Sequence, residues 1–391
     1  MAKKVVFIGG GASNLIASIL LKKKYPFLDV LLIEKNNQLG RKLKATGSGR
    51  CNIAPISDDI SLFYNQQFVK DTIGEIPVKN QLEVLKTLGI ITKEIKGVGY
   101  YPISESASNV VNLLQNQLDT LGIKYILNTK VIDYSIKDKY IKLDNNDTLS
   151  FDYLIFGIGG SSYSSLGGED TLSNVFKSHG YKFNPQTPVL TPIKVKENVH
   201  KLFGIRLECQ VTLRENNKFV YQEKGEVQFR KDGLSGIVIL NISRFIDENK
   251  KYILEINPFI GKTHNLSKEQ FKELYRYNKN FLLSILPTSL VEYGLSRLDI
   301  NKDDIKENQL DIIYDYFSKI TFNVSKLFPL EYATVSRGGI DVNQIKDTFE
   351  SKIEDNVYFL GEIIDVDGPC GGYSLRFAIS SSIIFSDKFT L

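Results

Sequence analysis

Three consecutive glycines and one glutamate are the residues best placed to do chemistry in the first part of this chain of 391 residues. Gly9–Gly11 follow the apolar run 4–8, and Glu34 ends the apolar run 30–33. An acidic residue about 20 positions after such glycines is typical of a dinucleotide-binding βαβ unit. The glycines let the backbone approach a pyrophosphate, and the following helix offers N–H groups. Glu34 would accept hydrogen bonds from ribose hydroxyls and repel a 2′-phosphate, so an adenosine without that phosphate is favoured.

The elements that must position these residues have clear patterns. Runs 4–8 and 30–33 have the length and β-branched composition of buried strands. Between them, residues 12–23 place four leucine and isoleucine side chains on one helical face. Asn14 occupies the third glycine position of the fingerprint, which predicts a helix lifted slightly from its strand. The alternative is a βαβ turn that binds no nucleotide.

A basic, glycine-rich stretch follows at residues 35–52. It has neither a helical nor a strand period, so we expect a loop that lies over an anionic, planar ligand. A solvated loop is the alternative. That alternative explains the lysines, but it does not explain the pair Gly47 and Gly49 beside Arg50 and Asn52.

Four short segments in the first 52 residues form recognisable motifs: GGGASNL at 9–15, LIEKN at 32–36, LGRKL at 39–43 and TGSGRCN at 46–52. They resemble the motifs of the BaiN-like flavoproteins, also described as aminoacetone-oxidase-like FAD-dependent oxidoreductases. Asn14 and Ser48 stand where this family has glycine.

The resemblance continues to the end of the chain. The further matching segments are GIGGSSY at 157–163, GEV at 225–227, GLSG at 233–236, TFESK at 348–352, GEIIDVDG at 361–368 and GGYSLR at 371–376. Ser164, Ser374 and Arg376 stand where the family has proline, asparagine and glutamine. The matches span nearly the whole chain, and the C-terminal one is the most specific.

The resemblance implies an α/β fold with a discontinuous, Rossmann-like, two-dinucleotide-binding FAD domain, an inserted antiparallel β domain and a small helical cap. Prolines between 185 and 192 mark a boundary, strand patterns follow them, and a charged helical pattern covers 267–326. The predicted domains are 1–187 with 333–391 for FAD, 188–262 with 321–332 for the β domain, and 263–320 for the cap.

Glycine turns and acidic residues at both ends of the chain require one long ligand, and FAD satisfies this requirement. Its adenosine would meet Glu34, its pyrophosphate Gly9–Gly11, and its ribityl chain Glu362 or Asp367. A helix beginning near Gly372 would direct N–H groups at the flavin and stabilise the reduced anion. FAD is expected to bind non-covalently. The predicted cofactor-binding residues are Gly9, Gly11, Ala12, Ser13, Glu34, Lys35, Arg41, Lys42, Gly47, Gly49, Arg50, Cys51, Asn52, Val131, Gly159, Gly160, Gly361, Glu362, Asp367, Gly372, Tyr373 and Ser374.

The catalytic residues cannot be named from the sequence. Arg50 and Tyr373 are the candidates, and no general base stands out. Cys51 and Cys370 are more simply explained as packing residues, because the three cysteines contain no CxxC pair. The same spacing predicts no metal site. NAD(P)H is a candidate transient co-substrate.

Composition limits the class of protein. Hydrophobic content of 42% and charged content of 24% describe a globular protein of two or three domains. The net charge of +4 is small and the lysines are dispersed among acids, so we expect neither a nucleic-acid nor a membrane partner. The sequence shows no signal peptide and no apolar span of about 18 residues, which predicts a cytoplasmic protein. Separately, we expect a small-molecule substrate and a monomer or homodimer.

Three functions stay open at this point. The first is an FAD-dependent oxidoreductase that transfers hydride to or from a small organic substrate, with NAD(P)H or oxygen as redox partner. The second is a flavoprotein that acts on or binds RNA, and the third is a non-catalytic flavin-binding interaction protein.

Overall fold

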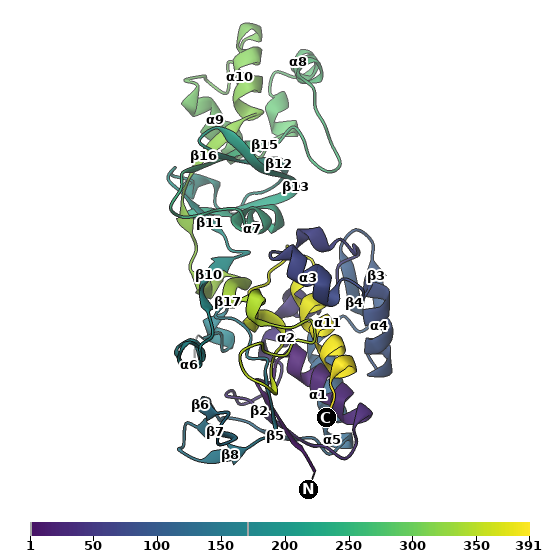
Figure 1. The fold of residues 1–391 in the computed structure, drawn as a ribbon. Helices are drawn as coiled ribbons and strands as arrows, with labels where there is room; N and C mark the ends of the chain where they lie inside the picture. The colour runs from purple at the N-terminus through teal and green to yellow at the C-terminus, as the bar shows by residue number, and fades with distance from the viewer. Residues whose placement is uncertain (1, 170–171) are drawn as a thin grey trace. The chain divides into compact units, whose positions relative to one another are not determined.

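The computed structural model describes residues 2–169 and 172–391, and the chain forms two compact units (Figure 1). The first unit, which we call the cofactor unit, comprises residues 1–187 and 334–391, and the second, the barrel unit, comprises 188–333. Each unit has its own cluster of buried hydrophobic side chains. A parallel sheet in one unit and an antiparallel barrel in the other confirm the predicted fold class.

The cofactor unit is organised around a five-stranded parallel sheet with the strand order β18-β9-β1-β2-β5. Consecutive apolar residues fill these strands because a parallel sheet is covered on both faces. In β1, for example, Val5, Val6 and Phe7 are fully buried. The strands are β1 (Lys4–Ile8), β2 (Asp29–Ile33), β5 (Lys124–Ile126), β9 (Tyr153–Phe156) and β18 (Val357–Phe359).

Two helices from opposite ends of the chain pack together in this unit. Helix α1 (Ala12–Lys24) begins directly after the glycine turn, and α11 (Tyr373–Lys388) ends the chain. A buried run of serines, 380–382, allows their close approach. The Ser382 hydroxyl donates a hydrogen bond to the Ser13 carbonyl at 2.8 Å. The chain's first and last helices therefore share one interface.

Smaller elements complete the cofactor unit. β3 and β4 form a hairpin, β6–β8 form an antiparallel sheet, and β10 pairs with β17. The helices are α3 (Gln66–Ile73), α4 (Val78–Thr87), α5 (Ala107–Thr120) and α6 (Ser173–Ser178). The strands are β3 (Thr92–Ile95), β4 (Gly99–Pro102), β6 (Val131–Ser135), β7 (Tyr140–Leu143), β8 (Thr148–Ser150), β10 (Phe183–Val189) and β17 (Val335–Ile340).

The barrel unit contains a closed barrel with the order β11-β14-β13-β12-β15-β16. Closure removes the exposed strand edges that an open sheet of this kind would present. Its strands are β11 (Ile193–Val195), β12 (Arg206–Glu215), β13 (Lys218–Arg230), β14 (Gly233–Ser235), β15 (Tyr252–Asn257) and β16 (Ile320–Leu327). Its helices are α7 (Ile237–Ser243), α8 (Lys268–Tyr277), α9 (Thr288–Arg297) and α10 (Leu310–Phe317).

One local prediction is wrong. The stretch 35–52, expected to be a loop, contains helix α2 (Arg41–Ala45) and a 3-10 turn at Thr46–Gly49. Leu43 is buried and anchors α2, while Gly40 starts the helix from a left-handed conformation with φ 68°. A helix of this length is too short to show a hydrophobic period.

Among residues 2–169 and 172–391, no helix is both long enough and apolar enough to cross a membrane.

Candidate functional site

The first glycine turn is shaped by contacts that only glycine permits. Gly9 has φ 98°, and a Cβ on it would lie 2.6 Å from the Gly157 carbonyl oxygen. A Cβ on Gly10 would lie 2.5 Å from a methyl of Leu39. Gly11 precedes α1, which Ala12 and Ser13 begin. The backbone is therefore bare at the helix N-terminus, where a phosphate group can approach N–H groups.

Glu34 is directed back at this turn from the end of β2. It is 7% exposed, and its Oε2 accepts a hydrogen bond from the Gly10 N–H at 2.7 Å. Its Oε1 accepts from the Asn36 backbone N–H at 2.8 Å. The carboxylate thus joins the glycine turn to the next loop. The Asn36 Nδ2 also donates to Oε1, at 2.5 Å. Three of about four acceptor positions of the carboxylate are therefore occupied, which leaves one for a ribose hydroxyl.

The room for Asn14 comes from a glycine on a different strand. The Asn14 Nδ2 donates to the carbonyls of Ile8 and Gly9 at 2.8 and 2.9 Å. A Cβ on Gly157, directly after β9, would lie 2.3 Å from the Asn14 Oδ1. The glycine that the fingerprint places on the helix is replaced here by one on the facing strand end.

A second group of predicted residues meets at Lys42. Its ammonium donates to the Gly160 carbonyl at 2.6 Å and lies 3.6 Å from the Glu362 Oε2. Glu362 Oε1 in turn accepts from the Ser336 backbone N–H at 3.1 Å. Gly159 has φ 71°, and a Cβ on it would lie 3.8 Å from the Glu362 Oε2. Segments from three distant parts of the sequence are brought together here.

The C-terminal segment also reaches the first glycine turn. Gly361 has φ 70°, and a Cβ on it would lie 3.1 Å from the Ser13 Oγ. Gly372, with φ 97°, precedes α11, and its Cβ would lie 2.7 Å from the Ala54 carbonyl carbon. The start of α11, including Tyr373 and Ser374, therefore lies directly against the chain that follows Asn52. This agrees with one ligand contacting both ends of the chain.

The glycine-rich segment 46–52 is strongly curved. Gly47, Ser48, Gly49 and Cys51 all have positive φ. Burial raises the pKa of the Cys51 thiol to about 11, so it stays a neutral packing residue. The Asn52 Oδ1 is buried and has no hydrogen-bond partner among the described residues. A buried acceptor without a donor is costly, so this atom fits a ligand that brings an N–H or O–H group.

Two other predicted residues, Arg50 and Lys35, have protein partners. Arg50 Nε donates to Glu105 Oε2 at 2.7 Å, and its guanidinium lies over the Tyr101 ring at 4.9 Å. Lys35 pairs with Glu169 at 2.7 Å, and burial lowers the pKa of this lysine.

The remaining predicted residues hold neighbouring segments in place. Arg41 donates to the Ser165 carbonyl at 2.9 Å, and Val131 is buried at the start of β6. These contacts hold surrounding loops and do not show what Arg41 or Val131 would touch on a cofactor.

Asp367 forms an ion pair that the sequence did not indicate. Arg337 Nε and Nη2 donate to its two carboxylate oxygens at 2.6 and 3.1 Å. The same guanidinium lies over the Tyr64 ring at 4.2 Å. The Asp367 side chain is fully buried, so Arg337 supplies the positive charge that this burial requires.

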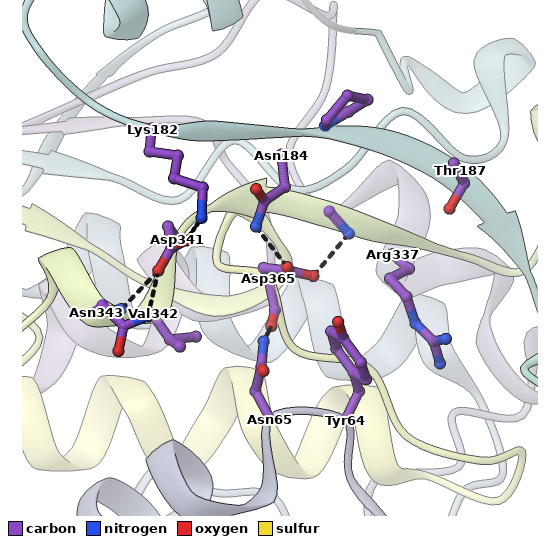
Figure 2. Close-up of a pocket in the computed structure, with 12 residues that line it drawn as sticks. Tyr64, Asn65, Lys182, Asn184, Thr187, Arg337, Asp341, Val342, Asn343 and Asp365 are labelled. Atoms are coloured by element: carbon purple, nitrogen blue, oxygen red, sulfur yellow. Dashed lines mark hydrogen bonds and ion pairs between the residues drawn. The ribbon is translucent and has the colours of Figure 1, made fainter.

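Arg337 of this ion pair also lines a polar cavity of about 440 Å³ (Figure 2). Asp365 accepts hydrogen bonds from the Asn184 Nδ2 and the Gly338 N–H, both at 2.8 Å. Burial raises the pKa of Asp365 above the ordinary value for aspartate. Lys182 pairs with Asp341 at 2.6 Å, and both residues line the same cavity (Figure 2). The sequence does not indicate this cavity, because its lining residues are isolated polar positions without a motif.

The geometry fits FAD. Gly9, Gly10 and Gly372 leave backbone bare where any Cβ would collide, and Glu34 and Glu362 offer carboxylates beside two of the glycine turns. The buried Asn52 acceptor needs a donor. When FAD is bound, Glu34 would hold its adenosine and Gly9–Gly11 its pyrophosphate. The region of Asn52 would hold its flavin end.

Comparisons with known proteins agree with this fit. A family model described as "HI0933-like protein Rossmann domain" matches residues 3–387. A 3-dehydro-bile acid delta(4,6)-reductase from Clostridium scindens is 27% identical over 96% of each chain. A ribosomal RNA dihydrouridine synthase from Haemophilus influenzae is 25% identical over 96% of each chain, and one from Escherichia coli is 26% identical over 96% of this chain and 95% of that protein.

The fold likeness extends to solved structures. An open conformation of a flavocytochrome c3 fumarate reductase matches with a TM-score of 0.51 and 13% identity, covering 98% of this chain and 77% of that one. At this identity the match supports the fold alone.

Proposed function

The chain belongs to the HI0933-like family of FAD-binding Rossmann proteins, FAD-dependent oxidoreductases, and we propose that it reduces a carbon–carbon double bond conjugated to a carbonyl group in a small organic substrate. In this proposal FAD is bound non-covalently and NAD(P)H is the source of electrons.

One observation carries the proposal. Two kinds of relative that align with 96% of this chain act on very different molecules, a bile acid and ribosomal RNA. Their names nevertheless describe the same change, the addition of hydrogen across a double bond that is conjugated to a carbonyl. The shared chemistry is therefore the part most reasonably extended to this chain.

The residues of the site suit such a reduction. FAD, when bound and reduced, supplies the hydride. The N–H groups at the start of α11 carry a partial positive charge, which favours the reduced, anionic cofactor. Hydride addition to one carbon places negative charge on the conjugated oxygen, and a proton must reach the neighbouring carbon. Arg50 and Tyr373 stay the candidates for positioning the substrate carbonyl.

Two measurements on the purified protein test the proposal. Heat denaturation should release FAD, and not FMN, into the supernatant. After anaerobic reduction with NADPH or NADH, a cyclic enone should restore the absorbance of the oxidised flavin, whereas the matched saturated ketone should not.

The outcomes separate the alternatives. Recovery of the absorbance only on admission of oxygen would replace the reductase with an oxidase. Flavin that stays attached to the denatured chain would contradict non-covalent binding. A reduced flavin that reacts with neither enone nor oxygen would favour a non-catalytic flavin-binding protein.

A further inference from the structure

The residues that line the polar cavity of about 440 Å³ all belong to the cofactor unit (Figure 2). Arg337 of β17 is one of them. The residue before it, Ser336, donates from its hydroxyl to the Glu362 Oε1 at 3.3 Å. Successive side chains of a strand lie on opposite faces. Strand β17 therefore separates the cavity from the Glu362 contacts that are assigned above to FAD.

The cavity contains charges of both signs, and its two cations are already neutralised. Lys182 pairs with Asp341 at 2.6 Å, and Arg337 donates two hydrogen bonds to Asp367. Among residues 2–169 and 172–391, Asp365 has hydrogen bonds but no ion pair. An anionic ligand would therefore meet the Asp365 carboxylate, and a cationic ligand would meet Lys182 and Arg337. This balance of charges suits a ligand that is polar and neutral.

Three asparagine amides supply acceptors with a fixed orientation. The Nδ2 atoms of Asn65 and Asn184 donate to the backbone carbonyl and the Oδ2 of Asp365, at 2.6 and 2.8 Å. The Nδ2 of Asn343 donates to the Asp341 Oδ1 at 2.9 Å. Flipping any of these amides would place oxygen against oxygen, so their orientations are set. Within 2–169 and 172–391 the three amide oxygens accept no hydrogen bond, which leaves them for a ligand that brings donors.

Two hydroxyl groups and one ring complete the set of groups in the cavity. In the part of the chain that the structure describes, the hydroxyls of Thr187 and Tyr64 form no hydrogen bond. Each can therefore donate to a ligand or accept from it. The Tyr64 ring is 39% exposed and lies 4.2 Å from the Arg337 guanidinium, so it offers an apolar surface beside polar groups. Together these groups match a molecule that has several hydroxyls and apolar C–H groups.

We propose that this cavity binds a neutral polyhydroxylated molecule, a monosaccharide or a polyol of similar size. Its hydroxyls donate to the amide oxygens of Asn65, Asn184 and Asn343 and accept from Thr187. The cavity volume is near the lower end of the range of about 300–1,000 Å³ that is usual for small-molecule sites. Such a ligand lacks the conjugated double bond of the substrate proposed above, so the proposal does not rest on that reaction.

The test uses the full FAD-loaded chain and saturation-transfer NMR, with D-glucose, D-ribose, D-sorbitol and myo-inositol as probes at about 5 mM each. At least one probe should receive saturation, and a titration of that probe gives its dissociation constant. Binding of sorbitol without the cyclic probes would assign an open-chain polyol. Binding of the cyclic probes without sorbitol would assign a ring.

Two variants locate the binding in the cavity. Asn184→Leu removes one amide acceptor and should weaken binding about tenfold. Thr187→Val keeps the shape of the side chain and should weaken binding about threefold. Because the Thr187 hydroxyl has no partner within the described residues, this second variant should fold normally.

Asn80→Leu is the matched control, since Asn80 is an exposed asparagine of α4 in the same unit and lies outside the cavity lining. Thermal unfolding and flavin absorbance establish that each variant is folded and loaded. Three results would overturn the proposal. The first is no saturation of any of the four probes, and the second is equal affinity of the two cavity variants and the control. The third is binding to the apo-protein that disappears on loading with FAD, because the probes would then occupy the place of the cofactor's own ribityl chain.

Discussion

At the scale of single residues, Glu34 has two roles, ligand binding and backbone support, and a substitution changes both at once. It was expected to bind ribose hydroxyls, and the structure adds that its two oxygens accept from the N–H groups of Gly10 and Asn36. Removing the side chain therefore leaves two backbone donors unpaired as well as removing a ligand contact. An experiment on this residue has to separate the two effects.

We expect Glu34→Ala to weaken FAD binding by about one to two decades, because hydrogen bonds to a charged group contribute roughly 1.5–3 kcal/mol. Glu34→Gln keeps an acceptor for Gly10 and should lose less affinity. Titration of FAD into each apo-protein measures the change.

Asp29→Ala is the control for this titration, because Asp29 is exposed at the opposite end of the same strand. Wild-type affinity in a folded Glu34→Ala protein would show that other residues recognise the ribose.

At the scale of elements, the start of α11 carries the argument for the flavin end of the site. Gly372 is held in a left-handed conformation against Ala54, so a larger side chain must displace backbone. Gly372→Val should weaken FAD binding and lower the reduction potential of the flavin. Loss of one preorganised donor costs about 2.7–4 kcal/mol in other active sites. FAD titration and a potential measurement on the folded variant check this expectation.

A matched variant at a second glycine distinguishes the effect of backbone strain from the loss of FAD contacts. Gly122 also has positive φ, 64°, but a Cβ on it would meet no atom within 4 Å. Gly122→Val should lower the free energy of unfolding while leaving FAD affinity and potential unchanged. If Gly372→Val behaved in the same way, Gly372 would be a turn glycine and nothing more.

The elements also show which features a sequence can predict. The first βαβ unit was predicted closely because its strands and helix are long enough to show their periods. The role of Gly157 in making room for Asn14 could not be predicted. The fingerprint identifies the altered position, but it does not identify the strand that faces it. Likewise, Asp367 was identified from its motif, but its partner Arg337 comes from a separate segment.

At the scale of the whole molecule, the alternation of β12 and β13 indicated an antiparallel insert, but not its closure. The short strands β11 and β14 complete the barrel, and three residues each give too little pattern to identify.

The two separate hydrophobic clusters lead to a prediction about how the whole chain unfolds. Each cluster lies within one unit, so we expect two unfolding transitions in calorimetry. The predicted FAD-binding residues all belong to the cofactor unit. Free FAD at about 100 times its dissociation constant stabilises a binding unit by about 2.7 kcal/mol, which should raise one transition by roughly 5–10 °C. The midpoint temperature of the other transition should not change. A single transition that moves as a whole would show that the two units unfold cooperatively, and a response of neither would contradict the assignment of FAD to the cofactor unit.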